Sequence, residues 1–167
     1  MWSKVEGHLR RSPARLKVAK TILEQGFHLG ENGTIYCGSI EVPSSKIAKA
    51  LEVDRRVVND TVKSILSEPD MHEIFTKIRS AGPFFGDVAK KQGFGVILIT
   101  ADPNTVGIVA KATALIANEG ISIRQVIAED PELFPEPKLT IVTEREVPGR
   151  IIPKFLKIPG VKSLSVH

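Results

Sequence analysis

The sequence predicts an α+β fold in two parts, with a helical first half and a second half in which strands and helices alternate. Two observations carry this. Residues 12–25 and 43–79 repeat apolar side chains at intervals of three and four, which is typical of helices. Residues 93–127 combine a β-branched run, a helical pattern and an alternating strand. The length of 167 residues suits two small domains better than one.

The first clear helix is predicted over residues 13–24. Ser12 can cap its first amides, Pro13 fits the first helical position, and Gly26 ends the helix. Residues 1–11 show no periodicity. Residues 27–42 are rich in glycine, and they predict a hairpin or a pair of loops that ends in a short strand at residues 40–42.

Residues 43–66 have the spacing of two short helices packed steeply across a turn. Ile47, Ala48 and Leu51 face inward from the first, Val53 fills the turn, and Asp54 caps the second. This pattern resembles a helix-turn-helix DNA-binding unit. It differs from winged-helix relatives because another helix, predicted over residues 70–79, follows where a wing hairpin would stand.

The exposed start of the second helix is the candidate for base recognition. Arginine suits the two acceptors of guanine, asparagine suits adenine, and hydroxyl and lysine groups at the first helix can hold phosphates. The predicted DNA-binding residues are Ser44, Ser45, Lys46, Arg55, Arg56, Asn59 and Lys63. Two alternatives stay open from the residues alone, namely a solvated basic face and a three-helix dimerisation unit.

Periodicity stops between residues 80 and 92. The sequence therefore predicts a domain at residues 1–80, a linker at 81–92 and a second domain at 93–167. Phe84 and Phe85 are poorly suited to solvent, so the linker is expected to dock on one of the domains.

The second domain is predicted to have the order βαββαβ. Its strands are expected at residues 93–101, 121–127, 138–144 and 161–166, and its helices at 106–119 and 148–157. Asn104 or Thr105 is the expected N-cap of the first of these helices, and Gly120 its left-handed stop. This order can form an antiparallel four-stranded sheet with both helices on one face and the other face uncovered.

Two strings of the second domain, residues 104–110 and 113–123, resemble the ACT domain, a ferredoxin-like module that senses amino acids in metabolic enzymes and regulators. ACT domains usually have Asp three residues before the loop glycine, where this chain has Asn104. They usually have Asn between the aliphatic residues that open the second strand, where it has Ser122. The resemblance covers roughly residues 93–167 and implies amino-acid binding at this loop, with a second subunit closing the pocket.

The resemblance places a ligand site around Gly107, where a glycine lets a ligand approach the free amides of a helix start. The strand that follows is expected to begin beside it and to offer Ser122. The predicted ligand-binding residues are Asn104, Thr105, Val106, Gly107, Ile108, Ile121, Ser122 and Ile123. The alternative is that Gly107 only permits close packing and Asn104 only caps the helix.

No catalytic set, metal site or cofactor loop is visible, so neither catalytic nor metal-ligating residues are predicted, and no cofactor is expected. Cys37 is the single cysteine, and the four histidines are scattered. No leader or membrane-spanning run appears, which predicts a soluble cytoplasmic protein without membrane partners. Residues 1–91 hold 15 Lys+Arg against 11 Asp+Glu, whereas residues 92–167 hold 8 against 8. The net positive charge is thus confined to the first half, where a surface facing phosphates is expected.

These observations predict a transcriptional regulator of amino acid metabolism. An amino acid effector is expected in the ACT domain and DNA on the helix-turn-helix. A homodimer, or a higher even oligomer, is expected to form through the ACT domain. The competing hypothesis is a regulatory subunit that does not bind DNA and docks on a biosynthetic enzyme. A small-molecule enzyme ranks below both because no catalytic set is visible.

Overall fold

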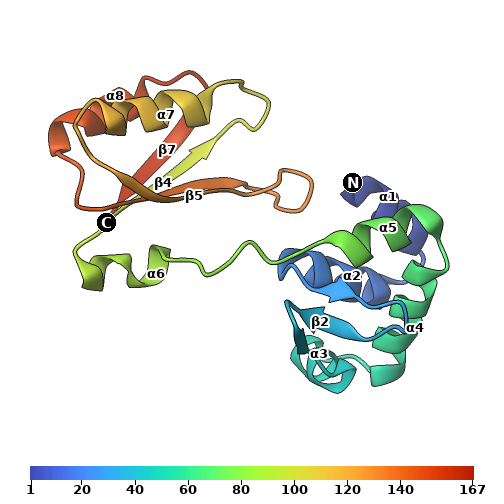
Figure 1. The fold of residues 1–167 in the computed structure, drawn as a ribbon. Helices are drawn as coiled ribbons and strands as arrows, with labels where there is room; N and C mark the ends of the chain where they lie inside the picture. The colour runs from blue at the N-terminus through green and yellow to red at the C-terminus, as the bar shows by residue number, and fades with distance from the viewer. The chain divides into compact units, whose positions relative to one another are not determined.

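The computed structural model describes residues 1–167, apart from the side chain of Lys90. The chain divides into two compact units, Met1–Gly82 and Pro83–His167. Residues 83–92, which the sequence places in a linker, belong to the second unit. The α+β class is confirmed, because helices and antiparallel sheets occur together in the structure (Figure 1).

The helices of the first unit bury one apolar stripe each. Val18, Ile22, Val58, Ile65 and Phe75 are fully buried between them. Burial of one such side chain contributes about 1.5–3 kcal/mol. The helices are α1 (Trp2–Leu9), α2 (Pro13–Glu24), α3 (Ser44–Leu51), α4 (Arg55–Leu66) and α5 (Pro69–Lys77). Helix α1 was not expected from the sequence, since only two of its residues, Val5 and Leu9, are buried.

A small antiparallel sheet lies between α2 and α3 in the chain. Its strands are β1 (His28–Leu29), β2 (Ile35–Cys37) and β3 (Ile40–Glu41), in the order β1-β2-β3. Gly33 has a φ of 81°, which a residue with a side chain rarely adopts, and lies in the turn between β1 and β2. The glycine-rich segment is therefore a three-stranded meander.

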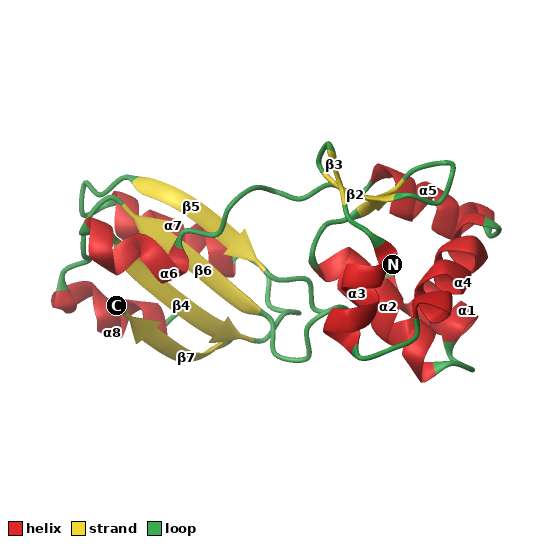
Figure 2. Cartoon of the chain, turned by 90° about the horizontal axis from the view of Figure 1, so that it is seen from below, coloured by secondary structure: helices red, strands yellow, loops and turns green.

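The second unit is a four-stranded sheet with the strand order β5-β6-β4-β7, each strand antiparallel to its neighbours (Figure 2). The strands are β4 (Gly95–Ala101), β5 (Ile123–Ala128), β6 (Lys138–Thr143) and β7 (Val161–Val166). The helices are α7 (Ile108–Ala117) and α8 (Ile152–Leu156), and the 3-10 turn η2 (Gly149–Ile151) precedes α8. The helix expected at residues 148–157 is shorter because Pro153, which lacks an amide hydrogen, lies in the first turn of α8.

Helices α7 and α8 cover one face of this sheet, as Figure 1 shows. Ile97, Ile99 and Ile141 of the strands are fully buried against Ile116 of α7 and Phe155 of α8. These side chains form the core that holds the loop after β4 and the start of α7 in place.

The opposite face is partly covered, which corrects the expectation of a bare face. A short helix, α6 (Gly86–Ala89), followed by η1 (Lys90–Gln92), lies on that side of the sheet in Figure 1. Ala89 of α6 is buried with Val96 and Val142, and Phe85 packs against them. The apolar residues of the segment dock it on the sheet.

Candidate functional site

The loop after β4 is fixed by Asp102. Its carboxylate oxygen Oδ1 accepts hydrogen bonds from the backbone N–H of Asn104 at 3.0 Å and from the Asn104 side chain at 3.2 Å. Its carbonyl oxygen accepts from the N–H of Thr105 at 3.0 Å, and its own N–H donates to the carbonyl of Gly160 at 2.8 Å. The loop therefore has a defined shape that is held from two sides.

Helix α7 begins after Gly107, which is its N-cap with a φ of 88°. The expected cap, Asn104 or Thr105, is wrong because the Asn104 side chain bonds back to Asp102 and not forward to the helix. None of the side chains that the structure describes caps α7. The amides of its first turn are thus available to an acceptor from outside the helix.

A cavity of about 540 Å³ opens beside this helix start. Its wall is mostly apolar, with Asp102, Glu129 and Lys138 as charged residues and Thr105 as a hydroxyl donor. The remaining lining residues are Ile99, Ala101, Pro103, Gly107, Ile108, Val109, Ala110, Ala128, Pro131, Pro137 and Leu139. Of the described atoms, the Lys111 Cε alone would lie within 4.0 Å of a carbon added to Gly107, so this glycine faces open space.

Three of the eight predicted ligand residues line the cavity, namely Thr105, Gly107 and Ile108. Asn104 and Val106 are exposed on the loop and do not line it. Ile121 is buried in the core, and Ile123 packs against the same core. Ser122 lies past the far end of α7, where its N–H donates to the Glu144 side chain at 3.2 Å.

The distance between Ser122 and the cavity follows from the helix. The 10 residues of α7 carry the chain roughly 15 Å back along the sheet before β5 begins. The expectation that this strand begins beside Gly107 is therefore wrong. Strands β4 and β5 both run antiparallel to β6, so they are parallel to each other. The end of β5, with Ala128 and Glu129, consequently reaches the helix start that follows β4.

Sequence reasoning missed both carboxylates of the cavity, Asp102 and Glu129. It also missed Ala128 at the end of β5 and the loop residues Pro131 and Pro137. A usable signal existed, because ligand sites in parallel strand-helix-strand units tend to lie at the carboxyl ends of the strands. Glu129 is held there by two contacts with Lys138. Its side chain accepts from the Lys138 N–H at 2.9 Å, and its own N–H donates to the Lys138 carbonyl at 3.0 Å.

The groups around the cavity are complementary to a small zwitterion. The uncapped amides of α7 can bind a carboxylate, since the positive end of the helix dipole lies there. The carboxylates of Asp102 and Glu129 can bind an ammonium group, and the apolar wall can bury an aliphatic or aromatic side chain.

The second candidate surface is on the first unit, where α3 and α4 meet across residues 52–54. Glu52 is in the left-handed conformation with a φ of 55° and ends α3. Asp54 Oδ1 accepts from the N–H of Arg56 at 2.7 Å and caps α4. Ala48 of α3 and Val58 of α4 are buried on the inner sides of the helices. The turn and cap predicted for this pair are confirmed.

Four of the predicted DNA-binding residues project from one side of α4. Arg55, Asn59 and Lys63 are four residues apart and exposed, and Arg56 is exposed beside them. Within the part of the chain that the structure describes, the side chains of Arg55, Arg56 and Lys63 have no hydrogen-bonding or ionic partner. Asp60 on the same helix lies 3.8 Å from Arg15 in an ion pair.

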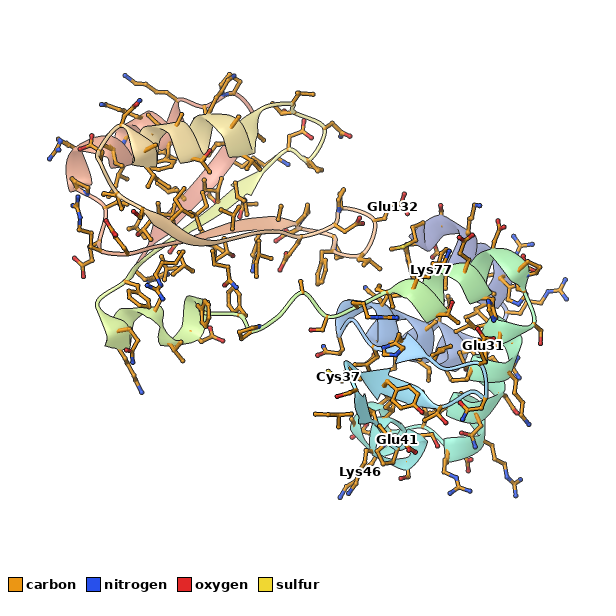
Figure 3. All side chains as sticks on the ribbon, viewed as in Figure 1. Glu31, Cys37, Glu41, Lys46, Lys77 and Glu132 are labelled. Carbon is orange, nitrogen blue, oxygen red and sulfur yellow. The ribbon has the colours of Figure 1, made fainter. Side chains whose placement is uncertain are left out.

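The residues at the start of α3 lie in its first turn. Ser44 is half-buried, and Ser45 and Lys46 are exposed. Figure 3 shows the Lys46 side chain pointing outward from the first unit. A phosphate can approach these groups from solvent.

Among the described residues, no group of three or more His, Cys, Asp or Glu side chains is placed to hold a metal ion. None of the helices described is long and apolar enough to cross a membrane.

The comparisons with known proteins leave the family open. No family model and no curated protein matches the chain. Among solved structures, the chain has a TM-score of 0.29 to PH0061, at 12% identity over 93% of this chain and 89% of that one. It has a TM-score of 0.27 to a transcriptional regulatory protein of the AsnC family from Pyrococcus furiosus, at 11% identity over 75% of this chain and 77% of that one. Scores this low carry no argument about fold or function.

Proposed function

We propose that the protein is an amino-acid-responsive transcriptional regulator. Its second unit, which resembles an ACT domain, binds an amino acid, and its helix-turn-helix pair binds DNA. The observation that carries the proposal is the cavity at the uncapped start of α7, which combines helix amides, two carboxylates and an apolar wall.

The proposed ligand is an amino acid with an uncharged, apolar side chain. Its carboxylate accepts from the first amides of α7, and its ammonium group pairs with Asp102 or Glu129. Ile99, Ile108 and Leu139 surround its side chain, which favours valine, leucine, isoleucine or phenylalanine over charged amino acids.

The proposed assembly is a homodimer, or a higher even oligomer, formed through the second unit. Support comes from exposed apolar side chains near the cavity, since Val106 is 90% exposed and Val109 43%. Val126, which is 39% exposed, lies on β5 at the edge of the sheet. A second copy that covers these residues would bury apolar surface and close the cavity over its ligand.

In such a dimer, the two α4 helices read adjacent turns of the DNA major groove. Arg55, Arg56, Asn59 and Lys63 contact bases and the adjoining backbone, while Ser44, Ser45 and Lys46 hold phosphates. The amino acid changes DNA affinity if it binds more tightly to one spacing of the two helices than to another.

A thermal-shift screen of the twenty amino acids on the full chain tests the ligand. An apolar amino acid present at about one hundred times its dissociation constant stabilises the folded state by roughly 2.7 kcal/mol. We expect the apolar amino acids to raise the melting temperature and the charged ones to leave it unchanged. If none of the twenty amino acids changes the melting temperature, and calorimetry confirms that none binds, the amino-acid part of the proposal is wrong.

Two variants at one position separate ligand loss from backbone strain. Gly107→Ala and Gly107→Asp share the strain of a side chain at a φ of 88°. Only Gly107→Asp places a negative charge where the ligand carboxylate would bind. We expect Gly107→Asp to lose amino-acid binding by about a hundredfold more than Gly107→Ala does, with DNA binding kept in both.

DNA binding is tested with a pool of random-sequence duplexes of about 30 base pairs at several salt concentrations. We expect the affinity to fall steeply with salt, because phosphate contacts release counterions. Arg55→Ala with Asn59→Ala is expected to weaken binding to DNA but not to the amino acid. Arg10→Ala is the control, since it removes one exposed charge at the end of α1. Absence of DNA binding by the full chain would favour the enzyme-docking subunit.

A further inference from the structure

A second groove of about 300 Å³ lies between α7 and α8, outside the amino-acid cavity. Lys111 of α7 lines it together with Lys154 and Lys157 from α8 and its C-cap. Its apolar lining includes Leu115, Ile158 and Pro159. The groove thus combines three cationic groups with an apolar floor.

No negative charge in the described part of the groove balances these lysines. All three are exposed. Among the described side chains, none forms an ion pair with them, and no Asp or Glu is among the lining residues. Glu119, on the turn that follows α7, is already paired with Arg150. Three like charges around one small groove repel one another, so a bound anion would relieve this repulsion.

We propose that this groove is a binding site for a small organic phosphate. The phosphate accepts hydrogen bonds from the ammonium groups of Lys111, Lys154 and Lys157, since each can donate three. The organic part packs against Leu115, Ile158 and Pro159. A volume of about 300 Å³ is at the lower end of the range for small-molecule sites, which favours a compact ligand.

The groove adjoins the amino-acid cavity through the first turn of α7. The Cε of Lys111 lies 4.0 Å from the position of a carbon added to Gly107, which lines that cavity. The phosphate site nevertheless stands on its own residues. It requires neither amino-acid binding nor DNA binding. Phosphate binding can therefore be absent while the proposed function holds, and it can be present while the proposed function is wrong.

Calorimetric titration of the full chain at constant ionic strength tests this site, with phenyl phosphate and inorganic phosphate as probes. We expect phenyl phosphate to bind about tenfold more tightly, because only it covers the apolar floor. Amide resonances of Leu115, Asn118 and Ile158 are expected to shift on its addition.

Matched variants show whether the three lysines hold the probe. A triple variant is expected to weaken phenyl phosphate binding at least about tenfold. It combines Lys111→Gln, Lys154→Gln and Lys157→Gln. The control combines Lys49→Gln, Lys91→Gln and Lys162→Gln, which removes the same charge from exposed positions outside the groove and is expected to keep the affinity.

Three results would overturn the assignment. The first is no binding of phenyl phosphate by the wild-type protein. The second is equal affinity for the two probes, which removes the role of the apolar floor. The third is equal weakening by both triple variants, which assigns binding to general charge. Circular dichroism spectra of the variants check that each is folded.

Discussion

Thr105 packs directly against the Cα of Gly160. A methyl group added to Gly160 would lie 2.5 Å from the Thr105 hydroxyl oxygen and 2.7 Å from its Cβ. The carbonyl oxygen of Gly160 also accepts a hydrogen bond from the Asp102 N–H at 2.8 Å. The φ of Gly160 is 86°. The turn before β7 thus supports the loop that lines the amino-acid cavity, although the two are more than fifty residues apart in the chain.

Gly160→Ala is expected to lower the free energy of unfolding by about 2 to 4 kcal/mol. The loss has two causes, because a side chain is strained in the left-handed backbone conformation and because the added methyl group collides with Thr105. The substitution is also expected to weaken amino-acid binding, because the loop must move. Urea unfolding measures the first effect and calorimetry the second. Gly149→Ala is the control, since an added carbon there meets nothing within 4 Å. Equal stability of the two variants would refute the contact.

Gln125 is expected to hold the segment before β4 on the sheet. Its side-chain amide donates to the Pro83 carbonyl at 2.7 Å, and its oxygen accepts from the Phe85 N–H at 3.0 Å. Gln125→Ala should lower the free energy of unfolding by about 1–2 kcal/mol. It should also speed hydrogen exchange at the Phe85 amide. Gln92→Ala, at an exposed position, should change neither. Unchanged exchange at Phe85 in Gln125→Ala would show that this residue does not hold the segment.

The caps of α4 and α2 are expected to differ in strength. The Asp54 carboxylate accepts from the Arg56 N–H at 2.7 Å, whereas Ser12 Oγ accepts from the Arg15 N–H at 3.4 Å, near the limit for a hydrogen bond. Asp54→Ala should therefore destabilise the protein by about 1 kcal/mol, and Ser12→Ala by less. Chemical denaturation followed by circular dichroism compares them. A larger loss for Ser12→Ala would contradict the geometry.

His28 is expected to make the stability depend on pH. Burial lowers the pKa of His28 below its usual 6.5, and the charge of Arg79 lowers it further. Its Nδ1 is buried and has no hydrogen-bond partner among the residues that the structure describes, and its ring stacks on Tyr36. Because the unfolded chain binds this proton more readily, the free energy of unfolding should fall as the pH is lowered through 6.5 towards the folded-state pKa.

Denaturation curves of His28→Gln at several pH values test this dependence. The variant should show a smaller loss of stability between pH 7 and about pH 5 than the wild type does. His167→Gln, at the exposed chain end, is the control and should keep the wild-type dependence. If His28→Gln and the wild type have parallel profiles, His28 does not cause the effect.

Much of the local structure was predictable, because it depends on neighbours in the chain. The apolar intervals placed α2, α3, α4 and α7 within a few residues, and Asp54 was correctly expected to cap α4. Helix α1 was not predicted because its buried apolar residues are too few to show a helical period. The start of α7 was misplaced because Asn104 has two possible partners, and only the folded loop selects Asp102.

The site depended more on the tertiary structure. Spacing along one element was enough to predict a glycine near the start of an apolar helix and an exposed basic face on α4. The residues that face that glycine across the cavity depend on how the strands pair in the sheet, so spacing along the chain could not predict them. Helix α7 carries the chain away before β5 returns it, so Ser122 lies far from Gly107, and Ala128 and Glu129 lie near it. The lysines of α7 and α8 likewise meet only because both helices cover the same face of the sheet.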